Sequence, residues 1–167
     1  MGDENSEQDK VGDAIAQGEA SMGELMIQKV YVKDLSFEAP NVPEVFNQEW
    51  KPQIDIQFQS GGTPLANDLR EVVLSATVTV RFEDKTVYLV EVQQAGLFKM
   101  AGFPEEIIKQ MLVTVCPNIL FPFIRETISD TVIRGGFPQL LLAPVNFEHL
   151  HAQEVQRKRE AQHGKTH

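Results

Sequence analysis

A chain of 167 residues, of which 42% are hydrophobic and 23% charged, is long enough for one domain with a real core and too short for two. Its formal charge of −9 offers no basic surface to phosphate groups, so nucleic acid is excluded as an expected partner and an anionic membrane surface is disfavoured. No stretch approaches the roughly 20 apolar residues that span a bilayer, and the acidic first 24 residues lack the apolar core of a secretory signal. The single cysteine, Cys116, excludes an internal disulfide and suits a reducing compartment, so we expect a cytoplasmic protein without direct membrane insertion.

The first 24 residues form a strongly acidic segment. They hold seven acidic residues against one lysine, and Val11 and Ile15 are their only large aliphatic side chains. Such a segment buries too little apolar area to offset the entropy of ordering. We therefore expect a disordered acidic extension over residues 1–24, one folded domain over residues 25–155 and a flexible C-terminal tail over residues 156–167.

Strand patterns dominate the next part of the chain. Residues 26–38 are rich in β-branched and aromatic side chains, and residues 53–59 alternate between apolar and polar. The clearest strand is residues 71–82, in which all the even-numbered residues are apolar. A fourth strand is predicted over residues 86–94.

Glycine, proline and turn residues mark the expected breaks between these strands. Pro40 and Pro43 lack a backbone donor, so an irregular loop should run to residue 50. Residues 60–64 (SGGTP) should end the second strand. Residues 83–85 make a tight turn, which requires the third and fourth strands to be antiparallel.

From Pro104 the apolar period becomes helical. Pro104 suits a first helical position, whereas Pro117 and Pro122 should break or kink the helix. Residues 137–144 are typical of an extended connector, and Asn146 can cap a last helix. Strands followed by helices predict an α+β fold, with helices on one face of an antiparallel sheet.

The sequence contains no recognisable motif of an enzyme active site: neither a phosphate-binding glycine loop nor a nucleophile elbow is present. Cys116 precedes a proline on an apolar helix, so we interpret it as a buried structural residue. Glu148, His149 and His151 are poorly placed as metal ligands, because residues two apart on a helix point to different sides. We therefore expect a binding protein with no catalytic residue, metal or cofactor.

Several separated stretches carry an unusual set of motifs: residues 33–41 (KDLSFEAPN), 91–96 (EVQQAG), 116–122 (CPNILFP) and 136–140 (GFPQL), the last leading into 142–147 (LAPVNF). In this order they resemble the SecB family of bacterial export chaperones, over residues 26–150. The resemblance implies a four-stranded antiparallel sheet with helices on one side, assembled as a dimer of dimers, a homotetramer. It also implies an ATP-independent chaperone whose surface grooves hold unfolded preproteins and whose sheets dock the SecA motor.

The resemblance also assigns the SecA-binding residues. In the fourth predicted strand the odd-numbered residues Val87, Leu89 and Glu91 should point away from the helices. Asp34 and Glu38 share a parity in the first strand and can add two carboxylates to one outer face. Asp34, Glu38, Leu89 and Glu91 match positions where the family binds SecA, although an ordinary solvated acidic face would show the same pattern.

A client-binding groove is expected along the loop after the first strand, formed by Val42, Pro43, Val45, Phe46 and Trp50. Exposed apolar grooves bind extended chains with little sequence preference. The alternative for Phe46 and Trp50 is that they are ordinary core residues.

The first long helix carries more apolar surface than one sheet face should need. We therefore expect a contact between dimers that includes Met111, Val115, Ile124 and Ile128. Two alternatives to a general export chaperone are open: a SecB-like chaperone dedicated to one client, such as an antitoxin, and a hotdog-like thioesterase that uses Asp34 or Glu91.

Overall fold

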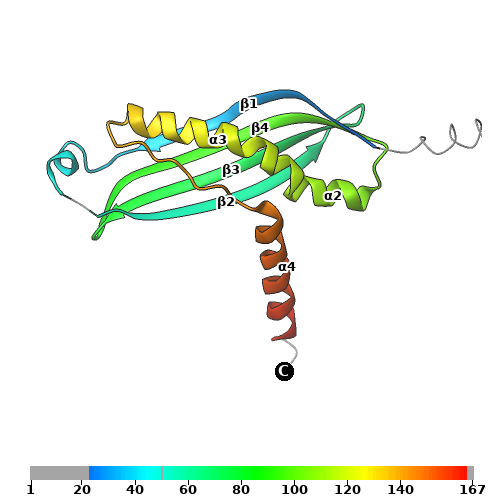
Figure 1. Cartoon of the computed structure of the whole chain (residues 1–167). Helices are drawn as coiled ribbons and strands as arrows, with labels where there is room; N and C mark the ends of the chain where they lie inside the picture. The colour runs from blue at the N-terminus through cyan, green and yellow to red at the C-terminus, as the bar shows by residue number, and fades with distance from the viewer. Residues whose placement is uncertain (1–22, 50, 165–167) are drawn as a thin grey trace, which may run out of the picture.

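A four-stranded antiparallel sheet organises the chain. The computed structural model describes residues 23–49 and 51–164. The strands are β1 (Glu24–Glu38), β2 (Gln53–Pro64), β3 (Leu69–Phe82) and β4 (Lys85–Ala101). Their spatial order is β1-β4-β3-β2 and every neighbouring pair is antiparallel, so β1 and β2 are the two edges (Figure 1). The predicted sheet is confirmed.

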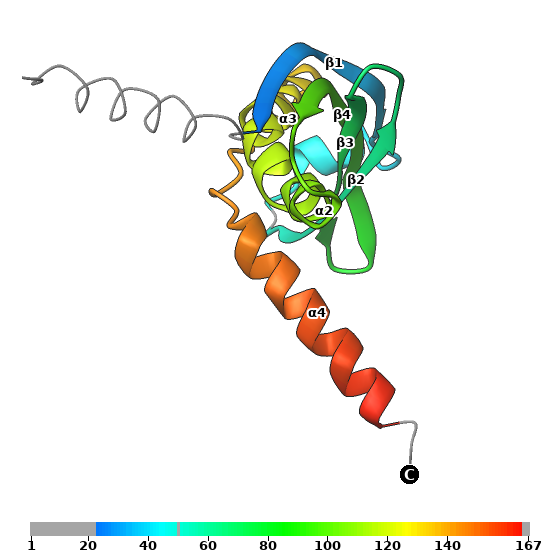
Figure 2. The same cartoon turned by 90° about the vertical axis from the view of Figure 1, so that its right-hand side faces the viewer.

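The helices cover one face of this sheet. α2 (Glu105–Val113) and α3 (Val115–Arg134) follow each other along it, and a short 3-10 helix, η1 (Glu44–Asn47), lies in the connection from β1 to β2 (Figure 1). α3 packs on β3 and β4, whereas α2 packs on β2. Seen from the end, the sheet curves around these two helices (Figure 2). The predicted α+β class is therefore confirmed.

The core lies between α3 and the two central strands. Along β3 burial alternates without a break, since the even-numbered residues from Val72 to Val80 are buried and the odd-numbered ones are only half-buried. Burying one large aliphatic side chain stabilises a fold by roughly 1.5–3 kcal/mol. The fully buried large side chains of this layer include Leu74, Val78, Val80, Val90, Val92, Phe98, Leu120, Ile124, Ile128 and Val132.

One predicted orientation in β4 is wrong. Val87, which was expected to face outward, is fully buried in the core. The pairing of β3 with β4 shifts at this point, so that Val80 pairs with Tyr88 while Arg81 pairs with Thr86. Val87 is the extra residue of a β-bulge, and a bulge takes its residue out of the strict alternation.

The second strand does not end at Ser60, as its glycines suggested. Gly61 pairs with Val73 and Gly62 with Val72, and β2 continues to Pro64. A Cβ atom on Gly62 would lie 2.7 Å from a methyl group of Leu112, so glycine allows α2 to approach the strand closely. Here glycine allows a close contact between the strand and α2, and it does not mark the end of the strand.

The helical run breaks at Thr114 and not at its prolines. Thr114 has φ −125° and ψ −72°, and its hydroxyl donates to the Gln110 carbonyl at 2.7 Å. α3 then continues through both prolines. Pro117 occupies the first turn, where backbone N–H groups have no helical partner, and Pro122 removes only one internal hydrogen bond. Of the two predicted outcomes, a break at these prolines is wrong, and a kink stays a prediction.

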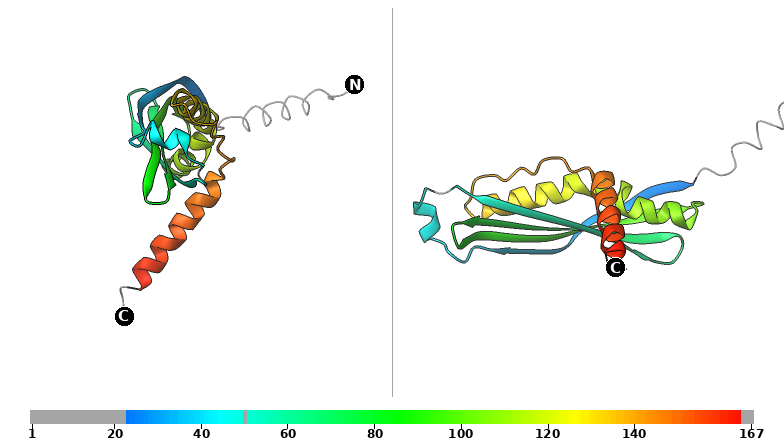
Figure 3. Two further views of the ribbon diagram at one scale, coloured as in Figure 1. Left: turned by 90° about the vertical axis from the view of Figure 1, so that its left-hand side faces the viewer. Right: turned by 90° about the horizontal axis from the view of Figure 1, so that it is seen from below.

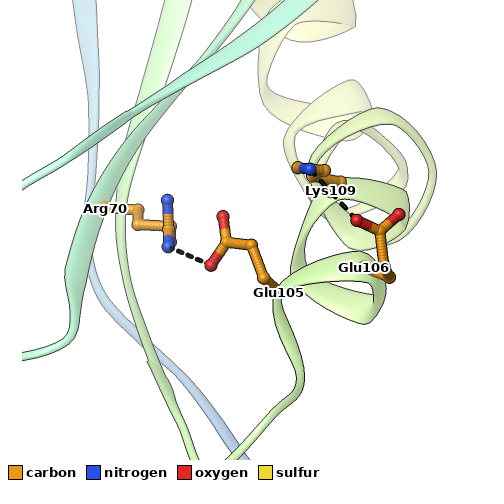
Figure 4. A network of polar contacts seen from close by, with 4 residues as sticks. All are labelled: Arg70, Glu105, Glu106 and Lys109. Carbon is orange, nitrogen blue, oxygen red and sulfur yellow. Dashed lines mark hydrogen bonds and ion pairs between the residues drawn. The ribbon is translucent and has the colours of Figure 1, made fainter.

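Ion pairs at the surface hold the start of α2 (Figure 4). Arg70 Nη2 on β3 lies 3.3 Å from Glu105 Oε2, and Lys109 Nζ lies 3.1 Å from Glu106 Oε1. Both glutamates are in the first turn, where negative charge complements the helix dipole. Because their side chains are exposed, each pair contributes little, about 0–1 kcal/mol.

The last helix projects from the body of the chain (Figures 2 and 3). α4 (Phe147–His163) begins after Asn146, whose Oδ1 accepts a hydrogen bond from the His149 N–H at 3.0 Å, as the predicted cap requires. The helix continues to His163, past the expected domain boundary at residue 155, and the flexibility of residues 156–167 stays a prediction. The predicted N-terminal extension lies outside the described residues, apart from Gly23 and Glu24.

A cluster of three aromatic rings anchors the first turn of α4. Phe147 is the one buried residue of the helix. Its ring meets those of Phe58 and Phe121 edge-on, with ring centroids 5.9 and 6.0 Å away. Edge-to-face pairs of this kind add about 0.5–1.5 kcal/mol beyond burial. Leu150, one turn further along, also packs against the core, and the helix beyond it is mostly exposed.

The segment Glu105–Arg134 is long and apolar enough to cross a membrane when judged by length and composition. In the folded chain it is divided at Thr114 and packs on the sheet, and 44% of its most apolar 18-residue window is buried. The core helix of a globular domain has the same composition, so this segment is explained by its place in the fold.

Candidate functional site

The sheet face opposite the helices is largely polar and carries several acidic residues. Residues that pair directly across two strands point to the same side of a sheet. Val90 and Val92 are buried beneath α3, so the residues between them and beside them on β4 face outward. Across β1 and β4 the outward pairs are Glu38–Leu89, Ser36–Glu91 and Asp34–Gln93.

The four residues predicted to bind SecA lie together on this face. Asp34, Glu38 and Glu91 are exposed and Leu89 is half-buried. Glu38 and Leu89 are direct partners, and Glu91 lies two residues further along β4. Among the described residues none of the three carboxylates forms an ion pair. This acidic patch, defined as Asp34, Glu38, Leu89 and Glu91, is therefore available to a basic partner.

Two β-bulges in β1 determine which way these carboxylates point. The pairing of β1 with β4 shifts between Ile27 and Lys29, and again between Val32 and Asp34. Each extra residue reverses the inward and outward alternation of the strand that follows. Sequence parity predicted that Asp34 and Glu38 share a face, and the second bulge places that face on the outside.

An open apolar groove of about 460 Å³ lies between η1, the start of β2 and the connector that follows α3. Its lining consists of Phe46, Gln48, Pro52, Ile54, Val80, Tyr88, Gly136, Phe137, Pro138, Gln139 and Leu140. Phe46 is 49% exposed, and its ring centroid lies 5.1 Å from that of the buried Phe137. The groove therefore has a fixed aromatic floor and one exposed aromatic wall.

The structure separates the five residues predicted to form a client groove. Phe46 lines the groove and is not a core residue. Val45 is 5% exposed and belongs to the core, so it offers no surface to a client, and Val42 is half-buried against that core and lies outside the groove lining. Pro43 is exposed but lies outside the groove lining, and Trp50 lies outside the described residues.

Most of the groove comes from residues that sequence reasoning had placed elsewhere. Ile54 and Tyr88 were expected to be sheet residues, and Phe137 and Leu140 to belong to a connector. The signal in the sequence was the apolar connector itself, which follows a glycine pair and has no helical or strand period. A segment that is apolar but irregular must lie against another element, and here it forms one side of the groove.

Gly136 explains how the connector and η1 come so close. Its φ is +87°, a conformation that residues with a side chain rarely adopt. A Cβ atom at this position would lie 3.2 Å from the Phe46 ring. Glycine is required both for the turn and for the place of Phe46 at the groove wall.

Two of the residues predicted to contact another chain face the wrong way. Ile124 and Ile128 are fully buried on the side of α3 that packs on the sheet, so they have no surface to offer a second chain. Met111 is also buried, and Val115 is half-buried. The exposed apolar residues of α3 and the following connector are Phe123, Ile133 and Leu141.

Cys116 has the properties of a structural residue. It is fully buried, and burial raises the pKa of its thiol to about 12, so it is protonated at neutral pH. Across residues 23–49 and 51–164 no three His, Cys, Asp or Glu side chains are grouped closely enough to hold a metal ion.

Similarity to known proteins decides the family. The sequence profile of SecB, described as preprotein translocase subunit SecB, matches residues 18–158. The protein-export protein SecB of Nitrosococcus oceani is 51% identical over 145 residues, which cover 86% of this chain and 88% of that protein. This chain belongs to the SecB family. The SecB protein of Pseudomonas syringae pv. tomato is 44% identical over 153 residues, which cover 92% of this chain and 93% of that protein.

A solved structure supports the SecB fold independently. The SecB-like chaperone of Mycobacterium tuberculosis, solved in complex with a peptide from an antitoxin, superposes with a TM-score of 0.63. The match covers 81% of this chain and 97% of that one at 18% identity, a level at which the likeness concerns the fold alone. Family membership assigns this SecB chain to protein export.

Proposed function

We propose that this chain is an ATP-independent cytosolic chaperone that holds unfolded precursor proteins and delivers them to the SecA motor. The observation that carries the proposal is the pair of separate surfaces on one SecB fold. One is the open apolar groove beside Phe46, and the other is the acidic patch on the outer sheet face. A chaperone that transfers clients needs two such surfaces, because client and motor must be bound at the same time.

The groove suits an extended, unfolded client. Apolar walls recognise side chains by area, and the polar groups of Gln48 and Gln139 at its edge can accompany a peptide backbone. The binding of only the unfolded state delays folding by mass action, which needs no nucleotide.

The acidic patch suits a basic segment of SecA. Within the described part of the chain its three carboxylates form no ion pair, and Leu89 adds an apolar contact beside Glu38 and Glu91. Complementary charge speeds the encounter and selects the partner, while an apolar residue beside the carboxylates adds contact area.

The assembly is proposed to be a homotetramer, a dimer of dimers. Phe123, Ile133 and Leu141 are 44%, 50% and 66% exposed on or beside the outer side of α3, which is more exposed apolar surface than an isolated helix face requires. These residues take the place of Ile124 and Ile128 in the proposed contact. Several grooves on one assembly raise the avidity for a long client.

The thioesterase alternative finds no support in the geometry. Asp34 and Glu91 lie on the outer sheet face, away from the apolar groove that would have to hold an acyl chain. A dedicated chaperone would bind one client protein, whereas a general export chaperone would bind many different precursors.

Affinity capture from a bacterial lysate separates these alternatives. The full chain should recover SecA together with many unprocessed precursors, and it should suppress aggregation of an unfolded client stoichiometrically without ATP. Recovery of one client without SecA would support the dedicated chaperone, and turnover of an acyl thioester would support the enzyme.

A further inference from the structure

A small polar network ties the edge strand β1 to the central strand β3 across the outer face of the sheet. The Tyr31 hydroxyl donates to Glu71 Oε2, and Lys33 Nζ lies 2.5 Å from Glu71 Oε1. Tyr31 and Lys33 are on β1 and Glu71 is on β3, so both β1 side chains must cross β4 to reach it.

Ala95 on β4 makes this crossing possible. It is the direct partner of both Tyr31 and Val73, so it occupies the middle strand at the level of the network. Ala95 lies on the outward side, yet it is fully buried. A larger side chain at this position would obstruct the path from Tyr31 to Glu71.

The network holds the two residues on either side of Val32, where β1 has its second bulge. The pairing shifts between Val32, opposite Gln94, and Asp34, opposite Gln93, which leaves Lys33 as the extra residue. Without that extra residue, every side chain from position 34 onward would point to the other face. Asp34 and Glu38 would then face the helices.

We propose that Glu71 is a positioning residue for the acidic patch, because by holding Tyr31 and Lys33 it fixes the bulge that turns Asp34 and Glu38 outward. The inference rests on the proposed docking of SecA at this patch. Glu71 need not touch SecA, since its carboxylate is already occupied by Tyr31 and Lys33.

An ordinary surface salt bridge is the simpler explanation, and it makes an opposite prediction. If only charge mattered, Lys33→Gln would remove a positive charge next to Asp34 and would raise the affinity for a basic partner. If Lys33 fixes the bulge, the same substitution lowers that affinity although the face has become more acidic.

The experiment measures SecA affinity for Lys33→Gln and Glu71→Ala in the full chain. Both should weaken binding about tenfold, a coupling within the range of residues in contact. Glu105→Gln is the matched control, because it removes the neighbouring Arg70 pair without touching β1 (Figure 4), and its affinity should equal that of the parent. Glu71→Asp should recover part of the loss, since a shorter carboxylate still offers acceptors to Tyr31 and Lys33.

Two further readouts separate this inference from the proposed docking itself. Amide hydrogen exchange over residues 29–38 should be faster in Lys33→Gln and Glu71→Ala than in the parent, with the oligomeric state unchanged. Adding Glu71→Ala to Glu38→Lys should cause little further loss of affinity, because the patch is already disabled. Unchanged exchange, or a Lys33→Gln variant that binds SecA more tightly, overturns the inference. A Glu38→Lys chain that binds SecA like the parent overturns the docking instead, and the exchange rates then report on the bulge alone.

Discussion

At the scale of single residues, the groove depends on a contact between one aromatic side chain and one glycine. Phe46 stays at the surface because its ring rests on the Phe137 ring and Gly136 leaves room for it. The neighbouring Val45 is buried in the core and anchors η1, whereas Phe46 is exposed at the groove wall. A change at Phe46 should therefore affect the groove more than the fold.

Phe46→Ser should weaken the capture of unfolded chains several-fold, because it removes the exposed wall of the groove. Its melting temperature and oligomeric state should stay close to those of the parent, since half of the side chain is already in water. Binding of a permanently unfolded client, followed by fluorescence anisotropy, measures the effect. Leu65→Ser is the control, because Leu65 is similarly exposed, at 48%, but lies away from the groove. An equal loss of client affinity in both variants would show that any exposed apolar residue contributes to client capture, whether or not it lines the groove.

Tyr31 should titrate abnormally late. Partial burial, the hydrogen bond to Glu71 and the charge of Glu71 together raise the pKa of the Tyr31 phenol to about 12. Since the unfolded chain ionises near the ordinary pKa of 10.0, the contribution of Tyr31 to stability is complete below pH 10 and declines as the pH rises toward 12.

Ultraviolet absorbance of the phenolate measures this titration. The chain has two tyrosines, so a Tyr88→Phe background leaves Tyr31 as the only one. Glu71→Gln should then lower the pKa of Tyr31, because the negative charge beside the phenol is gone. A pKa near 10 in the parent would show that the network is absent in solution.

At the scale of elements, each of the two layers presents two different faces. α3 turns Ile124 and Ile128 to the sheet, and turns Phe123 and Ile133 outward. β3 buries its even-numbered residues from Val72 to Val80 and β4 buries those from Tyr88 to Val92, whereas the odd-numbered residues that pair across the two strands form the outer face. Client binding, partner binding and assembly can therefore be changed separately.

Leu89→Arg or Glu91→Lys should abolish SecA binding while client capture persists, because both residues face away from the groove. In the parent, affinity for SecA should fall as salt rises, since exposed charges are screened over about 8–10 Å at moderate ionic strength. Titration calorimetry at two salt concentrations tests both statements. Asp55→Lys makes the same change of charge on the edge strand β2 of the same face and should have a much smaller effect. Unchanged affinity in Leu89→Arg and Glu91→Lys would exclude the patch as the docking site.

At the scale of the whole molecule, the surfaces described here predict an assembly of four chains. β1 is an edge strand, and the outer side of α3 carries the exposed Phe123 and Ile133, so within the described residues one chain offers two surfaces at which a second chain can add. Export chaperones gain from assembly because each added chain adds one more groove.

Sedimentation at micromolar concentration should give a mass near four chains, and Phe123→Glu combined with Ile133→Glu should reduce it. Both positions are exposed in the single chain, so the double variant should still fold. Ile124→Ala should act differently, losing about 2–5 kcal/mol of folding stability because it empties a fully buried site. If the double variant still sediments as a tetramer, the contact between chains does not include Phe123 and Ile133.

Periodicity alone predicted the elements that have one clear face. The alternation of β3 identified its buried residues, and the first long helix was recognised by its apolar stripe. Predictions made from local sequence rules were wrong where tertiary packing decided the outcome. Gly61 and Gly62 were expected to end a strand, but both pair with β3, and Gly62 leaves room for Leu112 of α2. Ile124 and Ile128 were assigned to an interface because the sequence shows that a residue is apolar but not which neighbour covers it.

Insertions were the second source of error. The bulges at Val87 and Lys33 each add one residue to a strand, and a strand with an extra residue has the same composition as one without it. The four residues of the acidic patch face outward together because they lie beyond the bulges, where alternation is regular again, and their binding of SecA stays a prediction. The groove could not be assembled in advance, since it joins η1, β2 and a connector that are far apart in sequence.

The attachment of α4 has a practical consequence for protein engineering. Only Phe147 at its first turn is buried, and the helix beyond it extends away from the body of the chain (Figure 3). Residues 152–163 can therefore be exchanged for a fluorescent label site or an immobilisation handle without disturbing the core. Such a handle would stand clear of both the groove and the outer sheet face, and would let single client-binding events be observed on a surface.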